Sequence, residues 1–329
     1  MNIAVFSTKP YDKSYLDAFN KNYGHQLTYF ESSLKKKSTK LTKGYDAVCI
    51  FVNDQIDEAT LADLAENEVK LIALRCAGFN NVDLKAAKKH NIKVVRVPSY
   101  SPEAVAEHAL ALIMTLNRKT HKAYNRVRES NFSLNNLTGF NIFGKEVGVI
   151  GTGQIGAAFC RIMLGLGCRV SAFDIHESEE LKSLGVQYKT LDMLYAQSDI
   201  ISLHCPLNSK TSHLINKESL EKFKPGAMLI NTSRGGLVDT TAIIEALKSH
   251  HLGYLGIDVY EQEENLFFED LSERILQDER ILRLLSFPNV LITSHQAFLT
   301  REALDQIADT VLSNISAFEA NKPLVNQIS

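Results

Sequence analysis

Three polar segments in the last third of the chain carry side chains that could act together on a small substrate. Arg234 follows one apolar strand-like run, a glutamate-rich loop at 261–264 follows a second, and His295 follows a third. In an open parallel sheet, ligands bind at the edge formed by the carboxyl ends of the strands. Each residue alone fits a surface role. Together, a fixed cation, a carboxylate and a histidine are the groups that reduction of a 2-oxo acid requires.

A glycine-rich turn near the middle of the chain indicates a dinucleotide site. Gly151, Gly153 and Gly156 follow an apolar run that ends at Ile150, and a helical pattern begins directly afterwards. The first glycine permits the tight turn, the second lets the backbone approach a pyrophosphate, and the third lets helix and strand pack closely. The helix N-terminus offers free N–H groups to the phosphates.

An acidic residue at the end of the next strand-like run indicates which dinucleotide binds. Asp174 can accept a hydrogen bond from an adenosine ribose and would repel a 2′-phosphate. The residues at 175–177 provide no arginine or lysine to hold such a phosphate. The expected cofactor is therefore NAD and not NADP.

The elements around these residues predict an α/β fold with two doubly wound parallel-sheet domains. Strand-like runs alternate with helical stretches on both sides of the glycine turn, as βαβ units do. The five runs before the turn are 3–7, 26–30, 47–52, 71–76 and 92–97, and the six from the turn onward are 147–150, 169–173, 199–204, 227–231, 254–259 and 290–294.

Two helices mark the expected domain boundaries. Ser101 suits an N-cap and Pro102 the first position of a long helix, while an amphipathic helix spans about 300–320 after the second sheet is complete. We expect that last helix to cross back onto the first domain. The prediction is a smaller flavodoxin-like substrate domain at 1–100 and 300–329, into which a Rossmann NAD-binding domain at 101–299 is inserted.

Composition excludes several other classes of function. The net charge of the 329 residues is −2, which provides no basic surface for nucleic acid or anionic lipid. There is no apolar run of about 18 residues to span a membrane. The five cysteines show no paired spacing and predict reduced thiols in a cytoplasmic protein, and no metal-binding pattern occurs.

The chain resembles the D-2-hydroxyacid dehydrogenase family along essentially its whole length, and within it the bacterial NAD-dependent D-lactate branch. Besides the glycine turn and the three polar segments, the resemblance rests on the stretches 75–83, 97–108 and 204–207. By matching position, it implies that Arg234, Glu263 and His295 are catalytic. Arg234 would grip the substrate carboxylate, His295 would donate a proton to the keto oxygen, and Glu263 would orient the imidazole. Glu261 remains a rival without an assigned role.

The resemblance also implies the remaining contacts. Backbone N–H groups of Ala77 and Gly78 would complete the carboxylate site in a cleft between the domains, and Tyr100 and Phe298 would cover the substrate. The implied NAD contacts, in addition to the turn glycines and Asp174, are Gln154, Ile155, Cys205, Pro206, Thr232, Ser233, Arg234 and Asp258.

The expected reaction is the reversible reduction of pyruvate to D-lactate by a homodimer or homotetramer. Two bulky aromatic residues favour a small substrate, although a larger acid such as 2-oxoisocaproate remains the enzymatic alternative. An NADH-sensing corepressor of the same fold is a further alternative. It is disfavoured because the chain contains no tryptophan.

Overall fold

The computed structural model describes residues 1–329, except for the side chain of Asn265. The chain forms two compact units, one of Met1–Ser101 with Phe298–Ser329 and the other of Pro102–Ala297. Both are α/β units built on a parallel sheet. No helix among the described residues is both long and apolar enough to cross a membrane.

The first unit contains a five-stranded parallel sheet in the order β2-β1-β3-β4-β5. Every predicted strand is present, but each ends one to two residues earlier than its apolar run. The chain then turns into the loops of the carboxyl edge. The strands are β1 (Asn2–Val5), β2 (Gln26–Tyr29), β3 (Ala47–Ile50), β4 (Leu71–Leu74) and β5 (Lys93–Val95), and the helices between them are α1 (Pro10–Asn20), η1 (Lys36–Thr42), α2 (Glu58–Glu66) and α3 (Leu84–Lys89).

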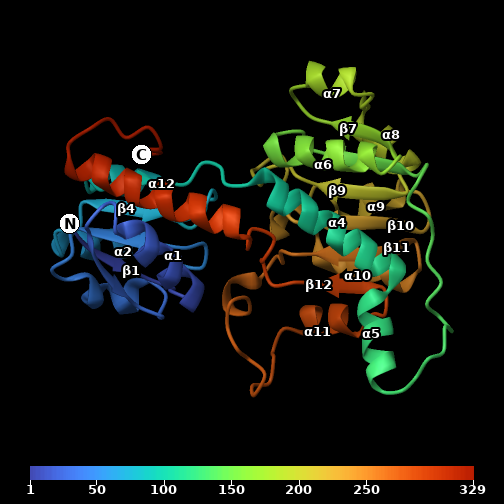
Figure 1. Ribbon diagram of the computed structural model, residues 1–329, viewed down its shortest axis with the longest axis horizontal. Helices are drawn as coiled ribbons and strands as arrows, with labels where there is room; N and C mark the ends of the chain where they lie inside the picture. The colour runs from blue at the N-terminus through green and yellow to red at the C-terminus, as the bar shows by residue number, and fades with distance from the viewer. The chain divides into compact units, whose positions relative to one another are not determined.

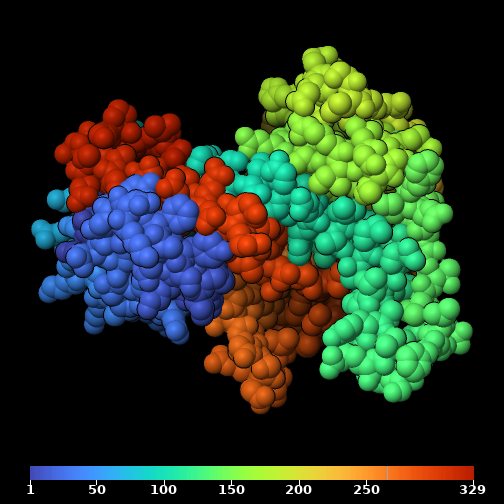
Figure 2. All heavy atoms as spheres, viewed as in Figure 1, coloured from blue at the N-terminus to red at the C-terminus, as the bar shows by residue number. Residues whose placement is uncertain are grey.

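The C-terminal helix α12 (Arg301–Glu319) belongs to this first unit. Thr300 caps it by accepting a hydrogen bond from the N–H of Ala303. Its apolar face is buried against α1 and β4, so the prediction that this helix returns to the first region is confirmed (Figure 1). Blue atoms of the N-terminal region adjoin red atoms of the C-terminal region in Figure 2. The Met1 ammonium lies 2.9 Å from Oε1 of Glu319, the last residue of α12.

The second unit contains a seven-stranded parallel sheet in the order β12-β11-β10-β9-β6-β7-β8. Strand order reverses between β6 and β9, which is the switch point of a doubly wound sheet. We predicted six strands. The missed strand is β8, which has only two residues and no apolar run to reveal it. The strands are β6 (Glu146–Ile150), β7 (Arg169–Phe173), β8 (Gln187–Tyr188), β9 (Ile200–Leu203), β10 (Ala227–Asn231), β11 (Leu252–Ile257) and β12 (Val290–Ile292).

Side chains of this sheet alternate between two apolar cores. Met228 and Ile230 of β10 face one core, which contains residues of α4 (Pro102–Arg118) and α6 (Gln154–Gly165), while Leu229 faces the other. α4 begins at Pro102, as predicted. The remaining helical segments are α5 (Thr120–Arg128), α7 (Glu179–Ser183), α8 (Leu191–Gln197), α9 (Lys217–Glu221), η2 (Gly235–Leu237), α10 (Thr240–Lys248), η3 (Glu263–Asn265) and α11 (Glu279–Ser286).

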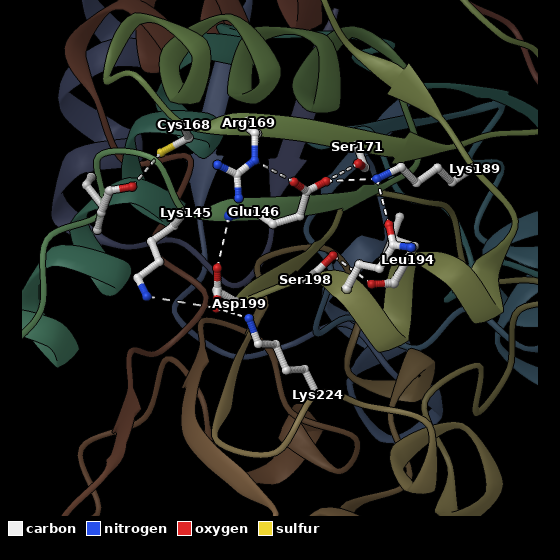
Figure 3. A network of polar contacts seen from close by, with 12 residues as sticks. Lys145, Glu146, Cys168, Arg169, Ser171, Lys189, Leu194, Ser198, Asp199 and Lys224 are labelled. Atoms are coloured by element: carbon white, nitrogen blue, oxygen red, sulfur yellow. Dashed lines mark hydrogen bonds and ion pairs between the residues drawn. The ribbon is translucent and has the colours of Figure 1, made fainter.

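A polar network joins the amino ends of β6, β7 and β9 (Figure 3). Glu146 accepts hydrogen bonds from Ser171 Oγ, Lys189 Nζ and Arg169 Nε, while Asp199 accepts from the Glu146 N–H and from Lys224 Nζ. Burial opposes the charge on Glu146, but these donors outweigh burial and lower its pKa. The network holds these strands together through its hydrogen bonds. It lies at the edge of the sheet opposite the glycine turn, so it does not occupy the carboxyl edge, where ligands bind.

All five cysteines are buried free thiols. Burial raises the pKa of Cys49 and Cys205 to about 11, and that of Cys160 to about 12. These thiols are therefore protonated at neutral pH.

Candidate active site

The three glycines of the turn have different surroundings. Gly151 has φ +93°, and a Cβ there would lie 2.6 Å from the backbone nitrogen of Cys205. A Cβ on Gly156 would lie 1.9 Å from the Gly151 carbonyl oxygen. A Cβ on Gly153 would meet no atom within 4 Å. The first and third glycines are therefore required by the fold, and the second leaves open space at the start of α6.

That open space lies at the N-terminus of α6, at the carboxyl end of β6. Gly153 is the N-cap residue, and as a glycine it has no side chain with which to cap the helix. Gly153 therefore leaves the first turn of the helix open to an anion, and a phosphate group is the ligand that such an N-terminus binds.

Asp174 lies directly after β7, beside the turn. Its Oδ2 accepts a hydrogen bond from the Thr152 N–H at 2.6 Å, and its Oδ1 accepts one from the His176 N–H at 2.9 Å. Partial burial alone would raise the pKa of this carboxyl, but the donated N–H groups outweigh it and lower the pKa. A carboxylate is thus held at the end of β7, where a dinucleotide ribose would reach it.

The loops after β9, β10 and β11 are in contact. Ser233 Oγ donates a hydrogen bond to the Cys205 carbonyl at 2.8 Å. A Cβ on Gly235 would lie 2.1 Å from the carbonyl carbon of Tyr260, so only glycine lets these two loops approach. Arg234 stands between these contacts. It is half-buried, and its Nη1 donates to the Ser233 carbonyl at 2.7 Å.

Other predicted cofactor residues lie at the same edge with differing exposure. Pro206 is exposed and Cys205 is buried beside the turn. Thr232 is 7% exposed, and its Oγ1 has no hydrogen-bond partner within the described part of the chain. A buried hydroxyl without a partner favours a ligand at this position.

His295 and Glu263 form a hydrogen-bonded pair. His295 Nδ1 lies 2.8 Å from Glu263 Oε1, and Glu263 Oε2 accepts the Tyr260 N–H at 2.9 Å. The side chains are 15% and 21% exposed. Because a carboxylate can only accept, Nδ1 carries a proton and the other ring nitrogen, Nε2, faces away from the carboxylate.

The structure also separates the two glutamates that the sequence left as rivals. Glu261 Oε1 lies 2.7 Å from Nε2 of His213, and its Oε2 accepts from Thr240 Oγ1 at 2.9 Å. Glu261 therefore pairs with a different histidine, and Glu263 is the partner of His295.

The backbone of His295 is held in a conformation that L-residues rarely adopt. Its φ is +53°, and its N–H donates to the Asp258 carbonyl at 2.7 Å. The Asp258 carboxylate accepts the N–H groups of Gln296 and Ala297 at 2.9 and 2.8 Å. One residue thus holds three successive amides, which is the support that a strained backbone requires.

Asp258 is itself held by two residues to which sequence reasoning gave no role. Thr293 Oγ1 donates to Asp258 Oδ1 at 2.5 Å, and Nε2 of His108 lies 3.0 Å from Thr293 Oγ1. Asp258 is fully buried, and these donors overcome the effect of burial and lower its pKa. The predicted cofactor residue Asp258 therefore also supports the His295 loop. His108 lies in one of the motifs of the resemblance, but its residue type alone did not reveal this contact.

An aromatic cluster lies at the carboxyl edge of the first unit. The rings of Tyr100 and Phe298 are 6.2 Å apart, and the ring of Phe51 is 5.7 Å from that of Phe298. We predicted Tyr100 and Phe298 but missed Phe51, which a position at the end of β3 could have suggested. Ala77 and Gly78 follow β4 at the same edge.

Comparison with known proteins identifies the family. Residues 110–297 match the family described as D-isomer specific 2-hydroxyacid dehydrogenase, NAD binding domain. The chain is also 53% identical over 328 residues to D-lactate dehydrogenase of Escherichia coli, covering 100% of both chains. The chain belongs to the D-isomer specific 2-hydroxyacid dehydrogenases. Its cofactor is therefore NAD, and its substrate is a small hydroxy acid or the corresponding oxo acid.

Solved structures of this dehydrogenase family have the same fold. The pyruvate reductase of Chlamydomonas reinhardtii is 47% identical with a TM-score of 0.94, and the match covers 99% of this chain and 98% of that one. A Salmonella D-lactate dehydrogenase is 53% identical with a TM-score of 0.88 over 100% of both chains. The open space at Gly153 and the carboxylate of Asp174 are features that a dinucleotide site requires.

Proposed function

We propose that this dehydrogenase reduces pyruvate reversibly to D-lactate, with His295 as the proton donor. The observation that carries the proposal is the pairing of His295 with Glu263 at the sheet edge that also bears the glycine turn. The E. coli relative named D-lactate dehydrogenase, at 53% identity, supports pyruvate as the substrate.

The side chains divide the chemistry among them. Arg234 binds the substrate carboxylate through its planar fork and polarises the neighbouring keto oxygen. His295, doubly protonated and with Nδ1–H on Glu263, donates the Nε2 proton to that oxygen. The Glu263 carboxylate orients the ring and stabilises its positive charge. The chemistry that NADH supplies when bound is hydride transfer to the carbonyl carbon.

The cofactor contacts follow from the elements that surround the turn. Gly151, Gly153, Gln154, Ile155 and Gly156 bind the pyrophosphate, and Asp174 binds the adenosine ribose. The loops after β9, β10 and β11 bind the rest of the dinucleotide through Cys205, Pro206, Thr232, Ser233, Arg234 and Asp258. In Asp258, Oδ2 accepts only the Ala297 N–H among the described groups. Because the side chain is fully buried, a carboxamide N–H would reach this oxygen only after the surrounding loop moves.

Besides Arg234, we assign substrate binding to residues of the unit 1–101 and 298–329. The N–H groups of Ala77 and Gly78 bind the carboxylate. Tyr100, Phe298 and Phe51 limit the size of the substrate side chain, which favours the pyruvate methyl group. A larger acid such as 2-oxoisocaproate is the alternative substrate.

We further propose a cytoplasmic homodimer or homotetramer. Large apolar side chains on α5 and in the segment after it are exposed and offer a surface that a second copy of the chain would cover. They are Tyr124 (62%), Phe132 (73%), Leu134 (80%) and Phe143 (77%).

The test is NADH oxidation by the purified protein with pyruvate, 2-oxobutyrate, 2-oxoisocaproate, hydroxypyruvate and glyoxylate, followed by chiral analysis of the product. The highest kcat/KM on pyruvate, with D-lactate as product, is the expected result. A preference for 2-oxoisocaproate would leave the proposed mechanism in place and replace pyruvate as the assigned substrate. NADH binding without turnover of any acid would overturn the proposal and favour an NADH sensor.

A further inference from the structure

The turn after β4 has three successive carbonyl groups that are each bound by a donor. The Cys76 carbonyl accepts the Val97 N–H at 3.3 Å. The Ala77 carbonyl accepts from Arg96 Nη1 at 2.7 Å. The Gly78 carbonyl accepts from Cys76 Sγ at 3.3 Å. Within the described part of the chain, the N–H groups of Ala77 and Gly78 donate to no protein acceptor.

The geometry of the peptide bond connects these two observations. In a planar trans peptide, the carbonyl oxygen and the following N–H point in opposite directions. The bond from Val97 to the Cys76 carbonyl therefore turns the Ala77 N–H away from residues 96 and 97. The bond from Arg96 to the Ala77 carbonyl does the same for the Gly78 N–H. Two adjacent amides thus point to the same side, which is how a short backbone segment binds an anion.

Arg96 is held in place by contacts at both of its ends. Its guanidinium carbon lies 5.2 Å from the centre of the Phe79 ring, in a cation–π arrangement. Its backbone N–H donates to the Asn326 carbonyl at 3.2 Å, and its own carbonyl accepts from Asn314 Nδ2 at 3.0 Å. Asn326 Nδ2 in turn donates to Asn314 Oδ1 at 2.9 Å. The C-terminal segment therefore holds the backbone of Arg96. The guanidinium of Arg96 in turn holds the turn after β4.

We propose that Arg96 is a positioning residue for the substrate carboxylate: by binding the Ala77 carbonyl it directs the Gly78 N–H, together with that of Ala77, toward the 2-oxo acid. This inference rests on the proposed function, which assigns those amides to the carboxylate. Arg96 acts through the peptide group and needs no contact with the substrate. Its positive charge adds to the attraction for an anion.

Lysine cannot fully replace arginine in this role. A lysine at position 96 would retain the charge, but it lacks the planar group that stacks on Phe79 while donating along a defined direction. Methionine would retain the aliphatic stem and lose both the hydrogen bond and the charge. The two substitutions therefore separate orientation of the turn from simple charge attraction.

The experiment compares Arg96→Met and Arg96→Lys with the unmodified enzyme in pyruvate reduction. It also measures the Kd of oxamate, an unreactive pyruvate analogue, in the presence of NADH. For Arg96→Met we expect the KM for pyruvate and the oxamate Kd to rise together by about 10-fold or more, since a charged hydrogen bond is lost. We expect kcat at saturation and the Kd of NADH to remain within about 2-fold. Arg96→Lys should bind pyruvate and oxamate more weakly than the unmodified enzyme and more tightly than Arg96→Met.

Arg283→Met is the matched control, because Arg283 is an exposed guanidinium that lies 4.8 Å from the Phe287 ring. Arg283→Met should change neither the KM for pyruvate nor the Kd of oxamate. Unchanged KM and oxamate Kd in Arg96→Met would overturn the inference, as would a fall in kcat or NADH affinity without a change in oxamate binding. If Arg96→Met does not fold, Arg96→Lys decides on the same criteria. Failure of the unmodified enzyme to reduce any 2-oxo acid would refute the proposed function first and remove this inference with it.

Discussion

His295 Nδ1 lies 2.8 Å from Glu263 Oε1, and the two residues stand in the loops that follow the neighbouring strands β12 and β11. This contact selects one glutamate from a loop that contains three, at positions 261, 263 and 264. It also assigns a proton to Nδ1 and so presents Nε2 as the nitrogen that can exchange a proton with a substrate. The pair is therefore the acid–base unit of the site that we propose.

Replacing Glu263 should impair the proton transfer selectively. In Glu263→Gln the ring loses the charged acceptor that holds Nδ1–H and so orients Nε2. We therefore expect kcat for pyruvate reduction to fall on the order of 10²-fold. Initial rates of pyruvate reduction at saturating NADH are the measurement.

Glu261→Gln is the control for this prediction. Glu261 is paired with His213 and Thr240, so its loss should leave the kcat of pyruvate reduction unchanged. Equal effects of the two substitutions would show that the loop acts as a whole and would remove Glu263 from its specific role.

Two glycines of the turn should respond differently to the same added methyl group. Gly153→Ala meets no neighbouring atom, so the protein should fold with an unchanged Tm, whereas its affinity for NADH should fall because the methyl group occupies the pyrophosphate space. Gly156→Ala collides with the Gly151 carbonyl and should reduce stability by about 1–3 kcal/mol. Thermal unfolding and NADH fluorescence titration distinguish the two effects. Retention of tight NADH binding by Gly153→Ala would place the pyrophosphate elsewhere.

Asp174→Ala should shift the preference between cofactors. The carboxylate accepts the Thr152 N–H, so loss of the carboxylate loosens the turn and weakens the binding of NADH and NADPH alike. Only its charge discriminates against a 2′-phosphate. We therefore expect kcat/KM for NADH to fall by more than that for NADPH, so that their ratio moves toward NADPH. Equal losses for both cofactors would refute the assignment of Asp174 to the ribose.

His204 should make stability depend on pH. Burial lowers the pKa of this histidine to about 3, from an ordinary 6.5, and its Nε2 lies 2.9 Å from Ser202 Oγ. Below pH 6.5 His204 binds a proton in the unfolded chain, whereas in the folded protein it binds one only near pH 3. The free energy of unfolding therefore falls as the pH falls from 6.5 to about 3. The slope for one full proton is about 1.4 kcal/mol per pH unit, and partial access of solvent to His204 reduces it.

The measurement is Tm at several pH values between 4.5 and 7 for His204→Gln and for His176→Gln, whose histidine is exposed. The first substitution should flatten the decline of Tm toward acid, and the second should leave it unchanged. An equal decline of Tm in the unmodified enzyme and in both variants would mean that His204 titrates alike in the folded and unfolded states.

Much of the site follows from local sequence because its parts are local in the chain. The glycine spacing at 151–156 predicts the turn, and the observed φ of Gly151 and the contact of Gly156 have the causes expected of them. Pro102 and Thr300 mark helix starts because capping and the fixed φ of proline act within one turn. Strand β8 was missed because two partly exposed residues carry no apolar period.

Tertiary structure alone decided which side chains meet. The residue types in 261–264 fit either glutamate as the partner of His295, and only the path of the chain between β11 and η3 brings Glu263 to it. Likewise, nothing in the sequence around Thr293 or Arg96 reveals a contact with Asp258 or Ala77. Such contacts join residues distant in the chain, and their geometry depends on how strands and loops pack, which a local pattern of residues does not encode.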